Sequence, residues 1–220
     1  MSNILLSKSY TAPPICLKEV LRYSGSKFLE SETEKVLKNV IEEAESVLNY
    51  DVCYKVLNVS VLNDLCDFGE FSLKSSGLAK NLSGCKCAVV FCATIGVGID
   101  RLVSKYSRVS QVKALLLDAL GSERIEALCD TFCRDIKKEL GKSAKPRFSP
   151  GYGDLPLEGQ TVLFSSLQPQ KRIGVTLNNS LLMTPSKSVT AIMGLFEGEE
   201  EKQISKCALC DKTNCIFRGV

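Results

Sequence analysis

The chain has 220 residues, 45% of them hydrophobic, which is enough to bury the core of one sizeable domain or two small ones. Its 28 basic and 25 acidic residues are evenly spread and give a net charge of only +3, so we expect neither nucleic acid nor a membrane surface as the main partner. The sequence contains no histidine, so we do not expect a hydrolase triad, and any chemistry must come from other side chains or a bound cofactor.

The first 80 residues predict two helices followed by two strands. Two prolines precede a short helix at Leu17–Tyr23, and Ser31 with Glu34 forms a capping box that begins a longer helix. Residues 53–62 are rich in β-branched side chains with partial alternation, which indicates a strand, and a shorter strand is predicted at 68–73. This part of the chain therefore predicts a small α+β unit.

A buried central strand is predicted at Cys87–Thr94, a continuous apolar run that ends just before Gly96 and Gly98. A dinucleotide-binding fingerprint has to be considered at these glycines. Its third glycine would fall at Arg101, and no acidic residue ends a second strand about 20 residues further on. We therefore interpret the two glycines as a tight strand-to-helix connection.

The second half of the chain mixes helices and strands without the regular alternation of a doubly wound fold. The longest predicted helix covers 109–140, with a break at Gly121–Ser122 as one reading of the pattern. A short helix is predicted at 157–167, and strands are predicted at 172–177 and 187–195.

The loop Arg147–Tyr152, with the sequence RFSPGY, has neither helical nor strand periodicity. Arg147 supplies a planar cation suited to a carboxylate or phosphate, and the Pro150-Gly151 pair shapes the backbone for close approach to a ligand. A surface turn that happens to carry an arginine is the alternative. Glu126 lies within an apolar helical stripe, where it is either at the solvated edge or facing a cleft with a functional role.

Three cysteines near the C-terminus form a C-x2-C-x4-C group. This spacing lets thiolates share one zinc or cluster iron, but a fourth ligand is missing. The fourth ligand could be another cysteine, a substrate thiolate or an open iron position; ligand-free or redox-sensing thiols on a mobile tail are the alternative. The predicted metal-binding residues are Cys207, Cys210 and Cys215, and the candidate fourth ligands are Cys16, Cys53 and Cys66.

The compartment can also be predicted. The first 14 residues lack a signal-peptide pattern, and the longest apolar run, 87–99, is too short to span a bilayer. Eleven cysteines, an odd number, suit a reducing environment in which most of them act as small buried hydrophobes. We therefore expect a cytoplasmic protein, with the cysteines at 87, 92, 129 and 133 in the core.

Three segments resemble the S-adenosylmethionine-binding activation domain of cobalamin-dependent methionine synthase, in its stand-alone form. Arg147-x-x-x-Gly151-Tyr152 is similar to the family's S-adenosylmethionine loop. Residues 117–128 resemble its central helix, including a glutamate at Glu126, and residues 183–194 resemble the strand pair behind the loop.

The resemblance implies an α+β fold: a C-shaped single domain with a twisted antiparallel sheet and flanking helices. This domain would cover residues 1–196, with residues 1–80 matching more loosely, and residues 197–220 would form an acidic linker and a cysteine-rich tail. The ligand-binding residues implied by the resemblance are Glu126, Arg147, Ser149, Gly151 and Tyr152.

The function implied is that of a methyltransferase subunit that reactivates a separate methionine synthase lacking its own activation domain. It would present the methyl group of S-adenosylmethionine for reductive methylation of cob(II)alamin on that partner, with a flavodoxin or ferredoxin as the reductant. Arg147 would bind the methionine carboxylate. The alternatives are a metal- or cluster-bearing partner of a corrinoid protein, acting in electron delivery or docking, and a binding module that has kept only the fold.

Overall fold

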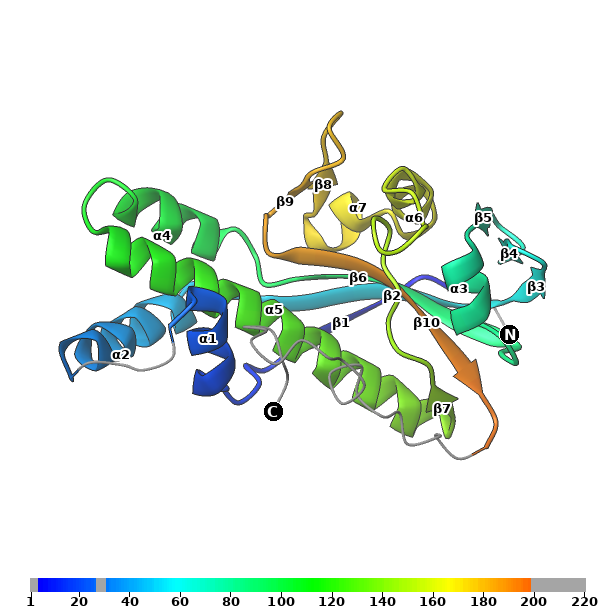
Figure 1. Cartoon of the computed structure of the whole chain (residues 1–220), viewed down its shortest axis with the longest axis horizontal. Helices are drawn as coiled ribbons and strands as arrows, with labels where there is room; N and C mark the ends of the chain where they lie inside the picture. Colours follow the sequence, from blue (N-terminus) through cyan, green and yellow to red (C-terminus); the bar gives the residue numbers. More distant parts are fainter. Residues whose placement is uncertain (1–3, 27–30, 199–220) are drawn as a thin grey trace, which may run out of the picture.

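A five-stranded antiparallel sheet forms the centre of the molecule in the computed structural model, which describes residues 4–26 and 31–198 (Figure 1). The strand order is β1-β2-β6-β10-β7, and each neighbouring pair is antiparallel. The strands are β1 (Leu6–Tyr10), β2 (Tyr50–Asn58), β6 (Cys87–Thr94), β10 (Ser188–Phe196) and β7 (Ser143–Ala144).

Both faces of this sheet are covered, so the side-chain alternation of its strands supplies two hydrophobic clusters. On β6, Val89 and Phe91 belong to one cluster, while Val90 and Cys92 belong to the other. All eight residues of β6 are buried, which confirms the central strand predicted at Cys87–Thr94.

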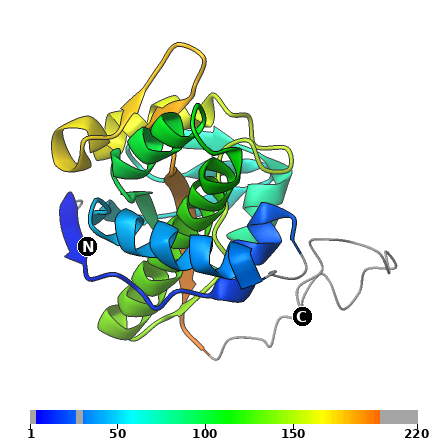
Figure 2. The ribbon, with the colours of Figure 1, turned by 90° about the vertical axis from the view of Figure 1, so that its left-hand side faces the viewer.

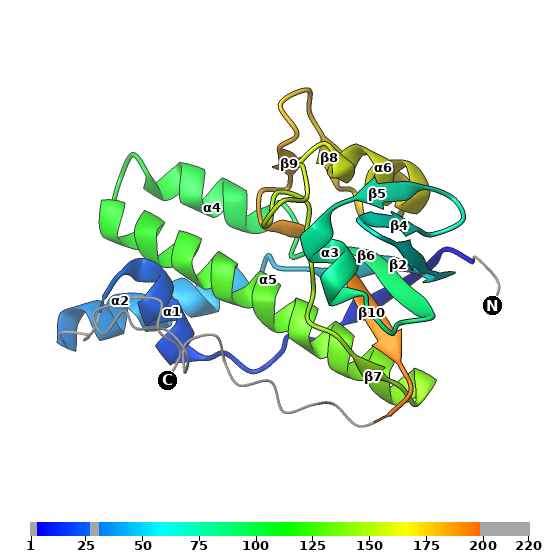
Figure 3. The ribbon, with the colours of Figure 1, turned by 45° about the vertical axis from the view of Figure 1, so that its right-hand side comes forward.

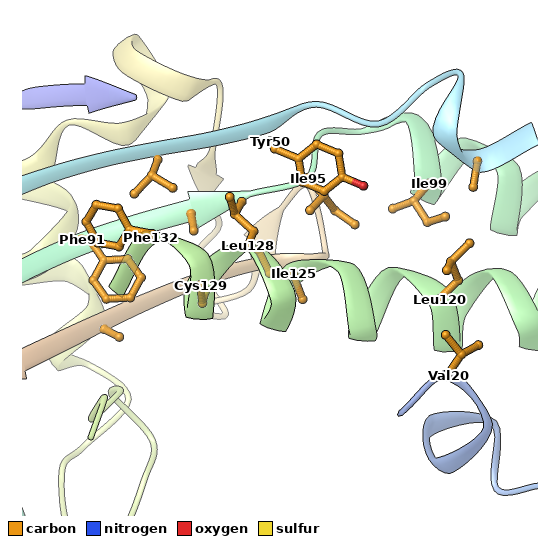
Figure 4. Packing of buried hydrophobic residues seen from close by; sticks show 14 of the residues in the cluster. Val20, Tyr50, Phe91, Ile95, Ile99, Leu120, Ile125, Leu128, Cys129 and Phe132 are labelled. Atoms are coloured by element: carbon orange, nitrogen blue, oxygen red, sulfur yellow. The ribbon is translucent and has the colours of Figure 1, made fainter. Parts of the chain in front are cut away.

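Four helices lie on the first face: α1 (Leu17–Ser24), α2 (Ser31–Glu45), α4 (Gly98–Tyr106) and α5 (Gln111–Leu140). Figures 1 and 2 show α5 running across the sheet with α1 and α2 beside it. Phe132 of α5 packs against Phe91 with ring centroids 4.8 Å apart, and Val20 and Ile99 pack around Leu120, nearer the N-terminus of the helix (Figure 4). Among the described helices, none is both long and apolar enough to cross a bilayer.

The second face carries short elements: α3 (Ser76–Asn81), α6 (Gly159–Leu167) and α7 (Pro169–Ile173) (Figure 3). A small sheet of β3 (Ser60–Leu62), β4 (Leu65–Asp67) and β5 (Ser72–Lys74) lies beside α3. The hairpin of β8 (Thr176–Leu177) and β9 (Met183–Thr184) projects near α6 and α7. The long α5 is thus on one face and these shorter elements are on the other.

The connection from β6 to α4 is the tight one predicted from Gly96 and Gly98. Gly96 has a positive φ of 79°, which favours glycine. A Cβ atom on Gly98 would lie 2.3 Å from the carbonyl oxygen of Val47, so a side chain there would collide with the backbone. The glycines are therefore explained by packing, without a nucleotide.

Several predicted element boundaries are wrong. The single strand predicted at 53–62 is two strands, β2 of the central sheet and β3 of the small sheet. Helix α5 is continuous through Gly121–Ser122, because the glycine lets Ile99 of α4 pack closely and the serine hydroxyl donates to the carbonyl of Asp118. Residues 68–71 form a turn between β4 and β5, with Gly69 at a φ of 81°. Residues 169–173 form α7, which ends at Gly174, so only 176–177 of the strand predicted at 172–177 is extended in a sheet.

Candidate functional site

Arg147 lies in a segment that runs along the outer edge of β10. The Lys145 amide donates to the Gly194 carbonyl at 2.8 Å, and Phe148 and Ile192 exchange two backbone hydrogen bonds of 2.9 Å. Successive side chains of an extended segment point in opposite directions. Phe148 accordingly enters the second hydrophobic cluster, while Arg147 reaches the first-face helix α5.

The Arg147 guanidinium makes ion pairs with two carboxylates one turn apart on α5. One terminal nitrogen is 2.8 Å from Glu126 Oε2, and the other is 2.6 Å from Asp130 Oδ1. The structure therefore brings together Arg147 and Glu126, which the sequence analysis selected, and adds Asp130, which it missed. A carboxylate four residues after Glu126 on the same helical face was the available signal.

Burial works against the charged form of Arg147, but the surrounding acidic groups outweigh it. The pKa of Arg147 is raised above its ordinary value because the thiols of Cys129 and Cys133 and the carboxylates of Asp130 and Glu126 surround it. The Cys133 sulfur lies 4.0 Å from one guanidinium nitrogen. Arg147 is thus a permanently charged group whose terminal nitrogens are both already paired.

The turn after Arg147 is held by its own backbone. Gly151 has a φ of 83°, and its amide donates to the Leu155 carbonyl at 2.9 Å. The Tyr152 amide donates to the Ser149 carbonyl at 3.1 Å, and the Tyr152 ring packs edge-on against Phe148 with centroids 5.4 Å apart. Tyr152 is 54% exposed despite this contact.

Asp154 ties this loop to the start of α3. Its carboxylate accepts hydrogen bonds from the Ser75 and Ser76 hydroxyls at 2.5 and 2.7 Å and from the Ser76 and Gly77 amides at 2.7 and 3.0 Å. These hydrogen bonds hold the pKa of the Asp154 carboxyl well below its usual range, and the one from the Ser75 hydroxyl contributes most. This contact could not be predicted from the sequence, because its partners lie more than 70 residues earlier in the chain.

A cavity of about 570 Å³ lies between α5 and α1, together with the segment that leads into α1. Its lining includes Glu126 and Asp130, so the two carboxylates that hold Arg147 also face the cavity. The loop residues Arg147, Ser149, Gly151 and Tyr152 are not part of this lining. The cavity therefore lies beside the loop: Glu126 and Asp130 line the cavity and also form the ion pairs with Arg147 of the loop.

A buried ion pair between Arg124 and Glu123, not predicted from the sequence, holds the segment before α1 that lines the cavity against α5. Arg124 donates to Glu123 at 2.5 and 2.7 Å and to the carbonyls of Pro13 and Pro14 at 2.5 and 2.9 Å. Glu123 also accepts from the Cys16 amide at 3.0 Å. Burial opposes the charge of Arg124, but its hydrogen bonds with Glu123 raise its pKa. An adjacent acid and base inside an apolar stripe was the signal in the sequence.

The predicted metal-binding residues Cys207, Cys210 and Cys215 lie outside the described residues, so the zinc or iron-sulfur site stays a prediction. Among residues 4–26 and 31–198, no group of three or more cysteines and carboxylates could hold a metal ion. Burial raises the pKa of the Cys53 thiol to about 12 and that of Cys66 to about 11, whereas Cys16 is exposed. Cys16 is thus the most accessible of the three candidate fourth ligands.

Comparison with known proteins identifies the fold. No protein-family model and no curated protein matches the sequence. A crystal structure of the MetH reactivation domain bound to AdoHcy superimposes with a TM-score of 0.64 over 90% of this chain and 80% of that chain, at 13% identity. The chain has the fold of the MetH reactivation domain. The predicted fold, an antiparallel sheet with flanking helices like that of the methionine synthase activation domain, is therefore confirmed.

Proposed function

We propose that this chain binds S-adenosylmethionine in the cavity between α1 and α5, and reactivates a cobalamin-dependent methionine synthase that lacks its own activation domain. The observation that carries the proposal is the carboxylate pair of Glu126 and Asp130, which lies between Arg147 and the cavity. The fold supports it, because the MetH reactivation domain of the same fold was crystallised with AdoHcy, the demethylated form of this ligand.

The cavity fits such a ligand in size and charge. A volume of about 570 Å³ lies within the range of small-molecule sites. S-adenosylmethionine carries a sulfonium cation and an ammonium group, and two carboxylates beside a partly desolvated cavity stabilise cations. Only one guanidinium is paired with the two carboxylates, so the pair keeps a net negative charge for the ligand.

The chemistry proposed for the reactivation requires no proton transfer. One electron from a reduced flavodoxin or ferredoxin and a methyl cation equivalent from the sulfonium convert cob(II)alamin on the partner to methylcobalamin and release AdoHcy. The residues of this chain hold the methyl donor in position and keep water away from it. A chain with no histidine can perform this role, because nothing in it has to act as a general base.

Titration calorimetry with S-adenosylmethionine tests the proposal, with and without a cob(II)alamin-loaded methionine synthase lacking its activation domain. We expect wild-type protein to bind, and Glu126→Gln to bind about tenfold or more weakly because one charged partner is lost. Glu42→Gln, an exposed carboxylate on α2, is the matched control and should bind as the wild type does. Absence of wild-type binding under both conditions would refute the proposed function.

A further inference from the structure

We infer that Asp154 is a positioning residue for the ligand, because it fixes the turn at residues 149–155, and with it the Tyr152 ring, against the first turn of α3. This inference rests on the proposed function, in which the bound ligand also meets the loop that carries Arg147. Asp154 does not touch the ligand in this role. It acts through the part of the loop that does.

The turn is attached to the rest of the fold through the Asp154 side chain. The backbone hydrogen bonds that close the turn have both partners within residues 149–155, so they shape it without anchoring it. The four donors to Asp154 instead belong to residues 75–77, which are the N-cap and the first turn of α3 (Figure 3). One carboxylate therefore joins the turn to α3.

Both oxygens of the Asp154 carboxylate are needed. Oδ1 accepts from the Ser75 hydroxyl at 2.5 Å and from the Gly77 amide at 3.0 Å, while Oδ2 accepts from the hydroxyl and the amide of Ser76, both at 2.7 Å. The Ser75 hydroxyl in turn accepts from the Leu78 amide at 3.0 Å and caps α3. An asparagine keeps one such oxygen but has an NH2 donor in place of the other, so two donors of α3 lose their acceptor.

The same attachment sets the position of two aromatic rings. A Cβ atom on Gly77 would lie 2.8 Å from Asp154 Oδ1 and 3.2 Å from Phe148 Cζ, so glycine lets the carboxylate and the ring both approach the start of α3. Tyr152 packs edge-on against the other side of this contact, on the Phe148 ring. Tyr152 is the half-exposed end of a stack that begins at α3, so its orientation towards a ligand depends on Asp154.

Calorimetry with S-adenosylmethionine measures the effect, at a temperature at which circular dichroism shows each variant to be folded. We expect Asp154→Asn to bind about tenfold more weakly, because two donors lose their acceptor and the turn is released. Ser76→Ala removes one donor and is the milder second variant, with an expected loss of about threefold. Asp67→Asn is the matched control, since its carboxylate accepts the Gly69 amide in a different turn, and it should bind as the wild type does.

A double-variant cycle with Tyr152→Ala separates positioning from a general loss of stability. If Asp154 acts through Tyr152, the variant that carries both Asp154→Asn and Tyr152→Ala should bind no more than about twofold more weakly than Tyr152→Ala alone. If Asp154 were only a structural residue, Asp154→Asn would lower the affinity by the same factor with either residue at position 152.

The outcomes separate the inference from the proposed function. If wild-type protein binds S-adenosylmethionine and both Asp154→Asn and Ser76→Ala bind equally well, the inference is wrong and the proposed function stands. Losses that multiply in the double variant would equally overturn the inference, because Asp154 would then not act through Tyr152. If wild-type protein does not bind S-adenosylmethionine, alone or with the cob(II)alamin-loaded methionine synthase, the proposed function fails and the inference fails with it.

Discussion

Replacing Arg124 by methionine should strongly destabilise the protein. Arg124 and Glu123 are 0% and 3% exposed, so the pair is removed from water together. Methionine has a similar length but carries no charge. The Arg124→Met variant leaves a buried glutamate whose remaining partner among the described residues is the Cys16 amide, and it leaves the Pro13 and Pro14 carbonyls without their donor.

The expected loss is about 3–5 kcal/mol of unfolding free energy, the usual effect of breaking a buried ion pair by removing one partner. For a chain of this size that corresponds to roughly 6–20 °C in melting temperature. The double variant Glu123→Gln with Arg124→Met should be more stable than the single variant, because it no longer buries an uncompensated charge.

Urea unfolding followed by circular dichroism measures these differences, with Arg108→Met as the control. Arg108 is exposed on the turn after α4, so its replacement should stay within about 0.5 kcal/mol of the wild type. A loss below about 1 kcal/mol in Arg124→Met, or a double variant less stable than the single one, would refute the reasoning. Hydrogen exchange should also speed up at the amides of Ile15 and Cys16 in the single variant, because the preceding Pro13 and Pro14 carbonyls lose their anchor.

Three further predictions concern packing, the loop anchor and the thiols. Gly98→Ala should cost roughly 1–3 kcal/mol in thermal unfolding, because its Cβ would collide with the Val47 carbonyl; an unchanged melting temperature would contradict this. Asp154→Asn should speed hydrogen exchange at the start of α3, since its charged hydrogen bonds weaken; equal exchange in both proteins would show that the anchor is dispensable. Alkylation at pH 8, analysed by peptide mass spectrometry, should modify exposed Cys16 well before Cys53, whose burial raises its pKa to about 12, and the reverse order would be inconsistent with the fold.

Local patterns in the sequence predicted the elements whose residues are all buried, such as β6. The unbroken apolar run at 87–94 predicted a strand covered on both faces, and the structure covers it on both. The turn at 68–71 was missed because Phe68 and Phe71 were read as strand residues. In the structure these two rings stack on each other across the turn, with centroids 4.9 Å apart.

The site was harder to predict, because its contacts join distant parts of the chain. The resemblance selected Arg147 and Glu126, but only the packing of the loop along β10 places them within 2.8 Å of each other. Besides the adjacent Glu123, the partners of Arg124 are two backbone carbonyls more than 100 residues away, and a carbonyl leaves no trace in the sequence. Which face of α5 lines a cavity likewise depends on where α1 packs.

The pairing of Arg147 with two carboxylates makes the site favour a cationic ligand over a neutral one. Two negative charges against one guanidinium leave an excess of negative charge beside the cavity, where Glu126 and Asp130 are also exposed to a ligand. The sulfonium of S-adenosylmethionine is attracted by this excess, whereas the neutral thioether of AdoHcy is not. In the proposed function, methyl transfer therefore removes the attraction that holds the ligand's centre, so the same carboxylates that favour binding of the donor weaken retention of the product.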